Sequence, residues 1–263
     1  MTTTLEQQLS FAVDTAQAAG ELILSYYETF PSGAMRMKDL RDPVTAADLA
    51  AERLIVERIR ERWPDTAIFA EEETRDANCD GLTWYVDPLD GTVNFSQSLP
   101  FFAVSIALYD GNTPLLGVVH APRLGETFAA ASGQGASLDG LPLAVSKKTE
   151  LIESVLATGF AYKRHELRDN NVDHFANFVL RVRGMRRCGS AALDLAYTAA
   201  GRLDGYWESQ LHPFDVAAGA VLVAEAGGLV TDMLGGDDWL HSGTIVAANP
   251  TLHGRMIEGL RAR

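Results

Sequence analysis

The chain has 263 residues, enough for one large α/β domain or two small ones around a substantial buried core. Its hydrophobic content of 47% and charged content of 22% are ordinary for a soluble globular protein. The formal net charge of −13 argues against a surface that binds nucleic-acid phosphates, because no basic block offsets it. We therefore expect no nucleic-acid partner.

The two cysteines, Cys79 and Cys188, lie far apart in the sequence and lack metal-ligand spacing. This usage favours a reduced, cytoplasmic protein. The N-terminus has no basic region followed by an apolar core, and no apolar run approaches transmembrane length. We expect neither a secretory signal nor contact with a membrane.

The first third of the chain begins with two predicted helices. Apolar residues recur every three or four positions from residue 5 to residue 26, which predicts an amphipathic helix. Residues 35–42 are expected to form an extended hairpin or loop that carries Lys38. Thr45 then opens a second helix in the manner of a capping box, with Asp48 in its first turn.

Two short apolar segments each run into acidic residues. Residues 67–70 predict a strand that leads directly into the glutamates at 71–73. Residues 84–86 predict a buried strand that ends at Asp87-Pro88, because proline cannot donate to a ladder and forces the preceding residue to be extended. Both strands therefore present carboxylates at their ends.

Asp90 is placed like the N-cap of a short helix, with the amides of Gly91 and Thr92 free behind it. Oxygen ligands for a cation and amide donors for an anion would then share one strand end, which favours metal-assisted phosphate chemistry. Asp-Pro and Asp-Gly are also common turn dipeptides, so these residues alone leave a plain structural turn open.

The remaining elements are predicted from apolar runs and turn residues. An antiparallel meander is expected at residues 101–109, 115–121, 126–131 and 136–138. Later strands are expected at residues 154–158, 183–187, 205–208, 229–231 and 244–248, and helices at 172–180, 191–200, 213–223 and from 249 onward. No linker separates them, so we expect one unit whose halves span about 1–145 and 146–263.

The acidic residues have structural explanations when they are taken singly. Asp48 and Asp215 lie in first turns of helices, where carboxylates act as caps, and a triple glutamate is commonly a solvated surface. Acidic groups nevertheless recur just beyond apolar strands, where open sheets place ligand sites. Several carboxylates that converge stay ionised together only beside cations, and an all-oxygen ligand set favours magnesium.

Four segments together resemble the inositol monophosphatase family. Residues 87–95 are similar to its Asp-Pro-Ile-Asp-Gly-Thr-x-Asn-Phe signature, and residues 212–219 with 225–228 to its Trp-Asp-x-Ala-Ala-Gly and Glu-Ala-Gly-Gly signature. Residues 42–48 resemble Asp-x-Val-Thr-x-x-Asp, and residues 70–72 resemble Gly-Glu-Glu. Ala70 and Phe214 depart from the usual glycine and tryptophan, and we expect both changes to leave the ligands in place.

The resemblance implies a layered α-β-α-β-α sandwich of the inositol monophosphatase and fructose-1,6-bisphosphatase type, commonly a homodimer. It also implies a site for two or three magnesium ions, whose ligands are Glu71, Asp87, the carbonyl of Leu89, Asp90 and Asp215. Thr92 and Glu71 would orient the attacking water, and Asp48 would assist through a further metal or water.

The resemblance assigns the substrate contacts to both halves of the chain. Gly91 and Thr92 would offer amides to the phosphate, and Lys38 would lie near the same site. The residues expected to face the leaving group are Gly189, Ser190, Ala191, Glu208 and His212.

The implied activity is magnesium-dependent hydrolysis of a small phosphate monoester, with inositol 1-phosphate as the first choice of substrate and lithium as an expected inhibitor. Histidinol phosphate is the main alternative because Glu208 would pair with an amine, and fructose 1,6-bisphosphate and a 3′-phosphoadenosine nucleotide also remain open. A regulatory binding protein that has lost activity is an alternative of another class. The intact set of carboxylates argues against it.

Overall fold

The structure is a computed structural model that describes residues 4–27, 36–39, 42–76 and 81–262, with the backbone alone at 36–39 and 42–44. The helices in the described residues are α1 (Leu5–Tyr27), α2 (Ala46–Arg62), α3 (Thr92–Ser96), α4 (Val172–Val179), α5 (Ala191–Ala199), α6 (Pro213–Glu225) and α7 (Pro250–Arg261), with a 3-10 turn at Leu151–Glu153. Most of these helices occupy the positions that the apolar spacing predicts.

The strands of the described residues form two large sheets and one short hairpin. The first sheet has the order β3-β4-β5-β6-β7-β8-β9, with β3 (Ala67–Ala70), β4 (Leu82–Asp90), β5 (Ala103–Asp110), β6 (Thr113–Ala121), β7 (Glu126–Ala131), β8 (Gly135–Leu138) and β9 (Leu141–Pro142). The second has the order β11-β10-β12-β14-β13, with β10 (Val155–Thr158), β11 (Gly184–Arg186), β12 (Gly205–Ser209), β13 (Leu229–Thr231) and β14 (Thr244–Ala248). The hairpin pairs β1 (Arg36–Asp39) with β2 (Asp42–Val44), as expected for this region.

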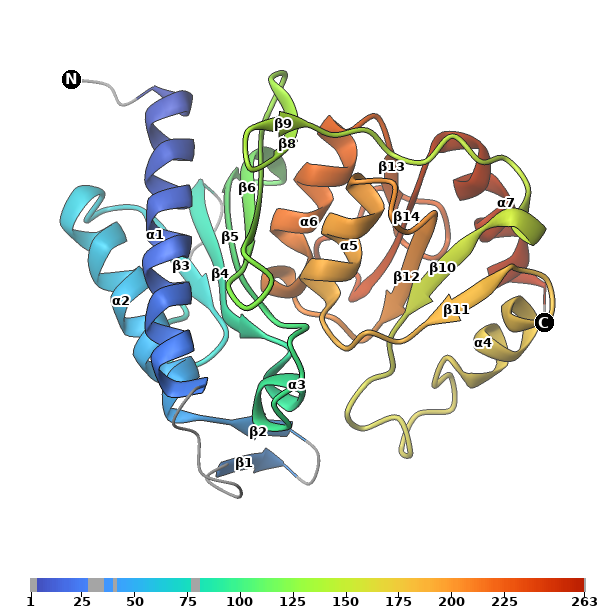
Figure 1. Ribbon diagram of the computed structural model, residues 1–263, viewed down its shortest axis with the longest axis horizontal. Helices are drawn as coiled ribbons and strands as arrows, with labels where there is room; N and C mark the ends of the chain where they lie inside the picture. The colour runs from blue at the N-terminus through green and yellow to red at the C-terminus, as the bar shows by residue number, and fades with distance from the viewer. Residues whose placement is uncertain (1–3, 28–35, 40–41, 77–80, 263) are drawn as a thin grey trace.

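Helices and sheets alternate in five layers (Figure 1). The helices α1 and α2 cover the outer face of the first sheet, α5 and α6 lie between the two sheets, and α4 and α7 cover the outer face of the second sheet. This arrangement confirms the predicted mixed α/β class and the α-β-α-β-α order of layers.

Strand β4 is longer than its sequence indicates. It pairs with β3 in parallel and with β5 antiparallel, and its register with β5 shifts between Asp87 and Asp90. Pro88 lies inside this irregularity, where a ladder hydrogen bond from its nitrogen is not required. The expectation that the strand ends at Asp87-Pro88 is therefore wrong, because the strand continues through a bulge to Asp90.

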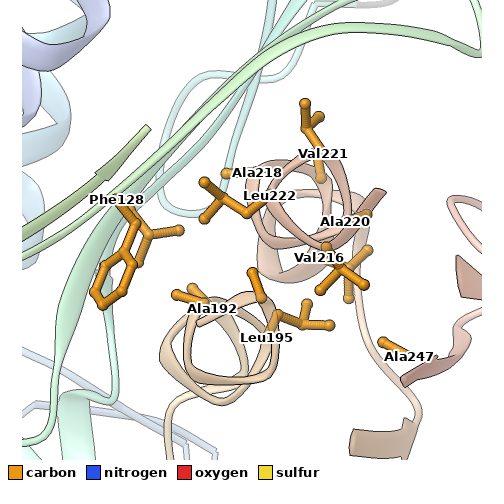
Figure 2. Packing of buried hydrophobic residues seen from close by; sticks show 14 of the residues in the cluster. Phe128, Ala192, Leu195, Val216, Ala218, Ala220, Val221, Leu222 and Ala247 are labelled. Atoms are coloured by element: carbon orange, nitrogen blue, oxygen red, sulfur yellow. The ribbon is translucent and has the colours of Figure 1, made fainter. Parts of the chain in front are cut away.

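Buried apolar residues form a core between each pair of neighbouring layers. In the central cluster, Leu195 of α5 and Val216 of α6 face each other and Phe128 approaches from the first sheet (Figure 2). Gly117 allows α6 to approach β6 closely, because a Cβ there would lie 2.5 Å from the carbonyl oxygen of Ala218. Since this cluster draws on both halves of the chain, we infer that they fold as one unit.

The structure bears on the expectations about membrane-spanning segments and about the two cysteines. No helix in the described part of the chain has the length and apolar character needed to cross a bilayer. Cys188 is a half-buried free thiol, and Cys79 lies outside the described residues.

Candidate active site

Asp87 lies in the bulge of β4 with only 2% of its surface exposed. One of its carboxylate oxygens accepts the N–H of Leu89 at 3.0 Å. Burial raises its pKa well above the ordinary value, and the negative charges of Glu71, Asp90 and Asp215 raise it further. A cation is the partner that would oppose this effect.

Asp90 differs from the prediction in its local role. The N-cap of α3 is Gly91, at φ +94°, so Asp90 does not cap that helix. The bulge instead directs Asp90 towards the N-terminus of α5, where its Oδ2 accepts the Ser190 hydroxyl at 2.6 Å and the Ala192 N–H at 2.7 Å. Burial raises the pKa of Asp90 to about 6 despite these hydrogen bonds.

Asp215 and Asp48 each close the first turn of a helix. Asp215 Oδ2 accepts the His212 N–H at 2.6 Å at the start of α6. Asp48 Oδ2 accepts the N–H of Thr45 at 2.8 Å and its hydroxyl at 2.5 Å at the start of α2. The capping interpretation is thus correct for both residues, and it fixes their carboxylates rather than excluding a second role.

Asp48 also contacts Thr92 directly. The Thr92 hydroxyl lies 3.0 Å from Asp48 Oδ1 and 3.1 Å from the carbonyl oxygen of Leu89, and its one proton serves one acceptor at a time. Burial raises the pKa of Asp48 to about 6. The structure thus adds a direct Asp48–Thr92 contact, and the expectation that Asp48 assists through a further metal or water stays a prediction.

Five acidic side chains gather around the end of β4, and we call them the carboxylate corner. They are Asp48, Glu71, Asp87, Asp90 and Asp215. Besides burial, the negative charge of Glu71 raises the pKa of each of the other four. The pKa of Asp215 is raised well above its usual range by burial and then by the charge of Glu71. The structure therefore brings together acidic groups from four separate segments of the sequence.

A cavity of about 610 Å³ opens at the carboxylate corner. Its lining includes eight residues that the sequence singled out, namely Glu71, Asp90, Gly189, Ser190, Ala191, Glu208, His212 and Asp215. Lys38 lies in β1, and its side chain falls outside the described part of the structure.

The side of the cavity near the ends of β10 and β12 is polar, and we call it the β10–β12 wall. It consists of Gly159, Arg187, Ser190, Asp194 and Glu208. Glu208 Oε2 accepts the hydroxyl of Tyr206 at 2.5 Å, and burial raises the pKa of Glu208 to about 7. A Cβ at Gly159 would lie 1.9 Å from Glu208 Oε2, so the glycine leaves the space that this carboxylate occupies.

Sequence reasoning missed several residues that shape the site. Asn94 donates to the carbonyl oxygens of Phe101 at 2.6 Å and Cys188 at 2.8 Å, and so joins α3 to the segment before α5. Arg187 and Asp194 line the cavity. Asn94 belongs to the signature itself and carried a signal, whereas Arg187 and Asp194 carried none that distinguishes them from surface or helix residues.

The oxygen donors at the carboxylate corner suit a hard divalent cation that keeps part of its water shell. Among the described residues, no group of three or more His, Cys, Asp or Glu side chains is arranged to hold a metal ion. Magnesium keeps several water ligands and commonly takes only one or two carboxylates, so it does not require such a group. Asp90 and Asp215, which have raised pKa values and line one cavity, fit that mode of binding.

Comparisons with known proteins agree with this geometry. Residues 4–263 match the sequence model of the inositol monophosphatase family. The chain belongs to this family. It is 42% identical to the Nus factor SuhB of Escherichia coli K12, over 98% of this chain and 97% of that protein.

Other members of the family carry the enzyme's name. The chain is 42% identical to the inositol-1-monophosphatase of a Synechocystis strain, over 98% of this chain and 90% of that protein. The inositol monophosphatase of Anabaena has a similar structure, with a TM-score of 0.89 and 40% identity, over 97% of this chain and 96% of that chain. The predicted family is therefore confirmed, and with it the phosphatase fold.

Proposed function

We propose that this protein is a magnesium-dependent phosphatase that hydrolyses inositol 1-phosphate to inositol and phosphate. The main support is the carboxylate corner, where buried acidic groups raise one another's pKa at the mouth of a cavity large enough for a small sugar-like ring. A dianionic phosphate is accepted by an acidic site when cations reverse the local field.

The ligands in this proposal are Glu71, Asp87, the carbonyl of Leu89, Asp90 and Asp215, for two or three ions. Bound magnesium stabilises charge on the phosphoryl oxygens and makes water a better nucleophile. One oxygen each of Asp87, Asp90 and Asp215 is held by a backbone N–H, so these side chains do not have to reorganise when ligand binds.

Thr92 and Asp48 form the proton-accepting pair of the proposal. The Thr92 hydroxyl orients the attacking water, while Asp48 Oδ1, 3.0 Å away, accepts the Thr92 proton. Glu71 would orient the same water. The amides of Gly91 and Thr92 contact the phosphate, and Lys38 is assigned to its neighbourhood from the resemblance alone.

The β10–β12 wall binds the leaving group in this proposal, together with Gly189, Ala191 and His212. Hydroxyls of a cyclitol suit Glu208 and Ser190, which offer a carboxylate and a hydroxyl into one cavity. Histidinol phosphate remains the competing substrate, because the same carboxylate would pair with its amine. The relative named inositol-1-monophosphatase supports the first choice.

A regulatory role is a second candidate, favoured by relatives named Nus factor. It need not replace catalysis, since the carboxylate corner contains every acidic side chain that the resemblance assigns to the metal site. A variant without phosphatase activity that still performs the regulatory task would separate the two roles.

Parallel assays test the proposal. Purified protein is assayed on inositol 1-phosphate, histidinol phosphate and fructose 1,6-bisphosphate, with Mg²⁺, after chelation, and after Mg²⁺ is restored. We expect the highest kcat/KM on inositol 1-phosphate, loss of activity on chelation and recovery with Mg²⁺. Activity that survives chelation contradicts the proposed role of the metal. A higher kcat/KM on histidinol phosphate contradicts the assignment of inositol 1-phosphate as the substrate.

The homodimer, the inhibition by lithium and the cytoplasmic location are proposed on the same family resemblance. Sedimentation analysis tests the first and an activity titration with lithium chloride tests the second. Fractionation of cells tests the third.

A further inference from the structure

We propose that Glu52 is a positioning residue that holds the turn carrying Glu71 and thereby sets the affinity of the site for magnesium. The inference rests on the proposed function, because Glu71 is a ligand only in that proposal. Glu52 lies on α2, four residues after Asp48 and on the same buried face of the helix. It is only 1% exposed.

The carboxylate of Glu52 gathers three consecutive backbone amides. Its Oε2 accepts the N–H of Glu72 at 2.6 Å. Its Oε1 accepts the N–H of Glu73 and the N–H of Thr74, both at 2.8 Å. All three donors belong to the residues that directly follow Glu71, so Glu52 fixes the backbone at this point.

Arg75 holds the opposite, carbonyl side of the same turn. Its guanidinium donates to the carbonyl oxygen of Ala70 at 3.2 Å and to that of Glu71 at 2.9 Å. It also lies over the rings of Phe69 at 5.4 Å and Phe214 at 5.7 Å. Because Phe214 precedes Asp215, this contact connects the Glu71 turn to the helix that carries another proposed ligand.

Strand β4 supplies a third support. The N–H of Glu71 donates to the carbonyl oxygen of Val86 at 3.2 Å, directly before Asp87. The backbone around Glu71 is therefore held by an anion on its amide side, a cation on its carbonyl side and the strand that carries Asp87.

A carboxylate at position 52 has a specific physical use. Burying a charge is costly unless it is hydrogen-bonded, and three charge-assisted bonds from N–H groups offset that cost. Its neighbours Ala51 and Ile55 on α2 pack into the apolar core, whereas Glu52 is directed at the turn. Groups that orient metal ligands in this way typically change metal affinity by about 10- to 100-fold when they are altered.

The test compares Glu52→Gln with the wild type. The glutamine retains the shape but replaces one acceptor oxygen with an NH₂ group, which opposes at least one of the three N–H donors. We expect Mg²⁺ affinity, measured by isothermal titration calorimetry with Mg²⁺ alone, to fall by about 10- to 100-fold. We also expect activity to recover when Mg²⁺ is raised, because Glu71 itself is retained.

The matched control is Glu57→Gln, an exposed glutamate on the same helix that removes the same charge. It should leave Mg²⁺ affinity within about twofold of the wild type, since it touches no part of the turn. Equal losses in both variants would mean that the charge of α2 matters and its position does not, which overturns the proposal.

Hydrogen exchange of the amides of residues 72–74 provides a readout that does not depend on metal or activity. Faster exchange in Glu52→Gln is expected, and unchanged exchange overturns the contact. Faster exchange with unchanged Mg²⁺ affinity overturns the positioning role. If the wild type itself neither binds Mg²⁺ nor hydrolyses phosphate esters, the proposed function fails instead.

Arg75→Lys covers the case in which Glu52→Gln does not fold. Arg75 is exposed, so its replacement should not disturb the core, yet lysine cannot donate to two carbonyl oxygens in the same planar geometry. The expected result is again a lower Mg²⁺ affinity that high Mg²⁺ concentrations compensate. Wild-type affinity in this variant overturns the proposal that the turn sets metal binding.

Discussion

The carboxylate corner and the β10–β12 wall are built in different ways. At the corner, hydrogen bonds between residues close in sequence fix three of the five acidic groups: Leu89 holds Asp87, Thr45 holds Asp48 and His212 holds Asp215. The wall is assembled from segments far apart in the chain, such as Gly159 beside Glu208. A locally built corner suits chemistry shared by a family, and an assembled wall can vary with the substrate.

Asp90 is the point where the two regions meet, and its loss should have the largest effect. Asp90→Asn removes a charge from the corner, while the asparagine oxygen can still accept from Ser190 and Ala192 at the start of α5. We expect Mg²⁺-dependent activity to fall by more than about 100-fold, beyond the effect typical of groups that only orient ligands. Assays with Mg²⁺ titration measure the loss, and unchanged circular dichroism shows that the fold is retained. Turnover within a few-fold of the wild type would remove Asp90 from the metal site.

Asp194, a residue of the wall, makes the free energy of unfolding of the protein depend on pH. It is 1% exposed, and one of its carboxylate oxygens has no hydrogen-bond partner in the structure. Burial raises its pKa well above the ordinary value of 3.8. The folded protein holds the Asp194 proton more tightly than the unfolded chain does. The free energy of unfolding therefore falls as pH rises from the pKa of Asp194 in the unfolded chain to its higher pKa in the folded protein.

Asp194→Asn should remove this loss. We expect the variant to match the wild type near pH 4 and to gain on it by about 1.4 kcal/mol per pH unit above that, until the folded pKa is reached. Urea unfolding from pH 4 to pH 8 at constant Mg²⁺ measures the difference. If the free energies of unfolding of the two proteins change with pH in parallel, Asp194 does not have a raised pKa in the folded protein.

Asn94 connects the two regions physically. Asn94→Ala leaves the carbonyl oxygens of Phe101 and Cys188 without this donor, and we expect a loss of about 2 kcal/mol in the free energy of unfolding. KM should rise more than kcat falls, because the loosened segment leads to Gly189 and then to Ser190 of the wall. Ser96→Ala, at a half-buried site on the same short helix, is the matched control, because the Ser96 hydroxyl bonds within that helix, to the carbonyl oxygen of Val93. A fall in kcat with KM unchanged would contradict this, and would mean that Asn94 acts on the chemistry at the carboxylate corner instead of on substrate binding.

Glu208 tests the wall with the smallest expected effect. For a neutral polyol, Glu208→Gln exchanges a charge-assisted hydrogen bond for a neutral one, and we expect kcat/KM on inositol 1-phosphate to fall by about tenfold. Because the pKa of Glu208 is raised to about 7, the variant should differ more from the wild type at pH 8 than at pH 6. A loss confined to histidinol phosphate would favour the amine substrate.

Local sequence patterns predicted most of the fold. The spacing of apolar residues located the long helices, and the turn residues located the meander, because both signals depend on neighbours within a few positions. The end of β4 was mispredicted. Pro88 cannot occupy an ordinary position in a hydrogen-bonded ladder. Only the pairing of β4 with β5 shows that a bulge accommodates Pro88 within the strand.

The sequence by itself determined the family and the acidic residues of the corner, since Asp87, Asp90 and Asp215 lie in contiguous signatures. Tertiary structure decided what the side chains do beyond their own segments. It directed Asp90 to α5 instead of α3, placed Glu52 against the Glu71 turn, and joined Asn94 to the segment before α5. These partners lie 20 to 102 residues away along the chain, and no local pattern encodes such contacts. They arise only when the layers pack.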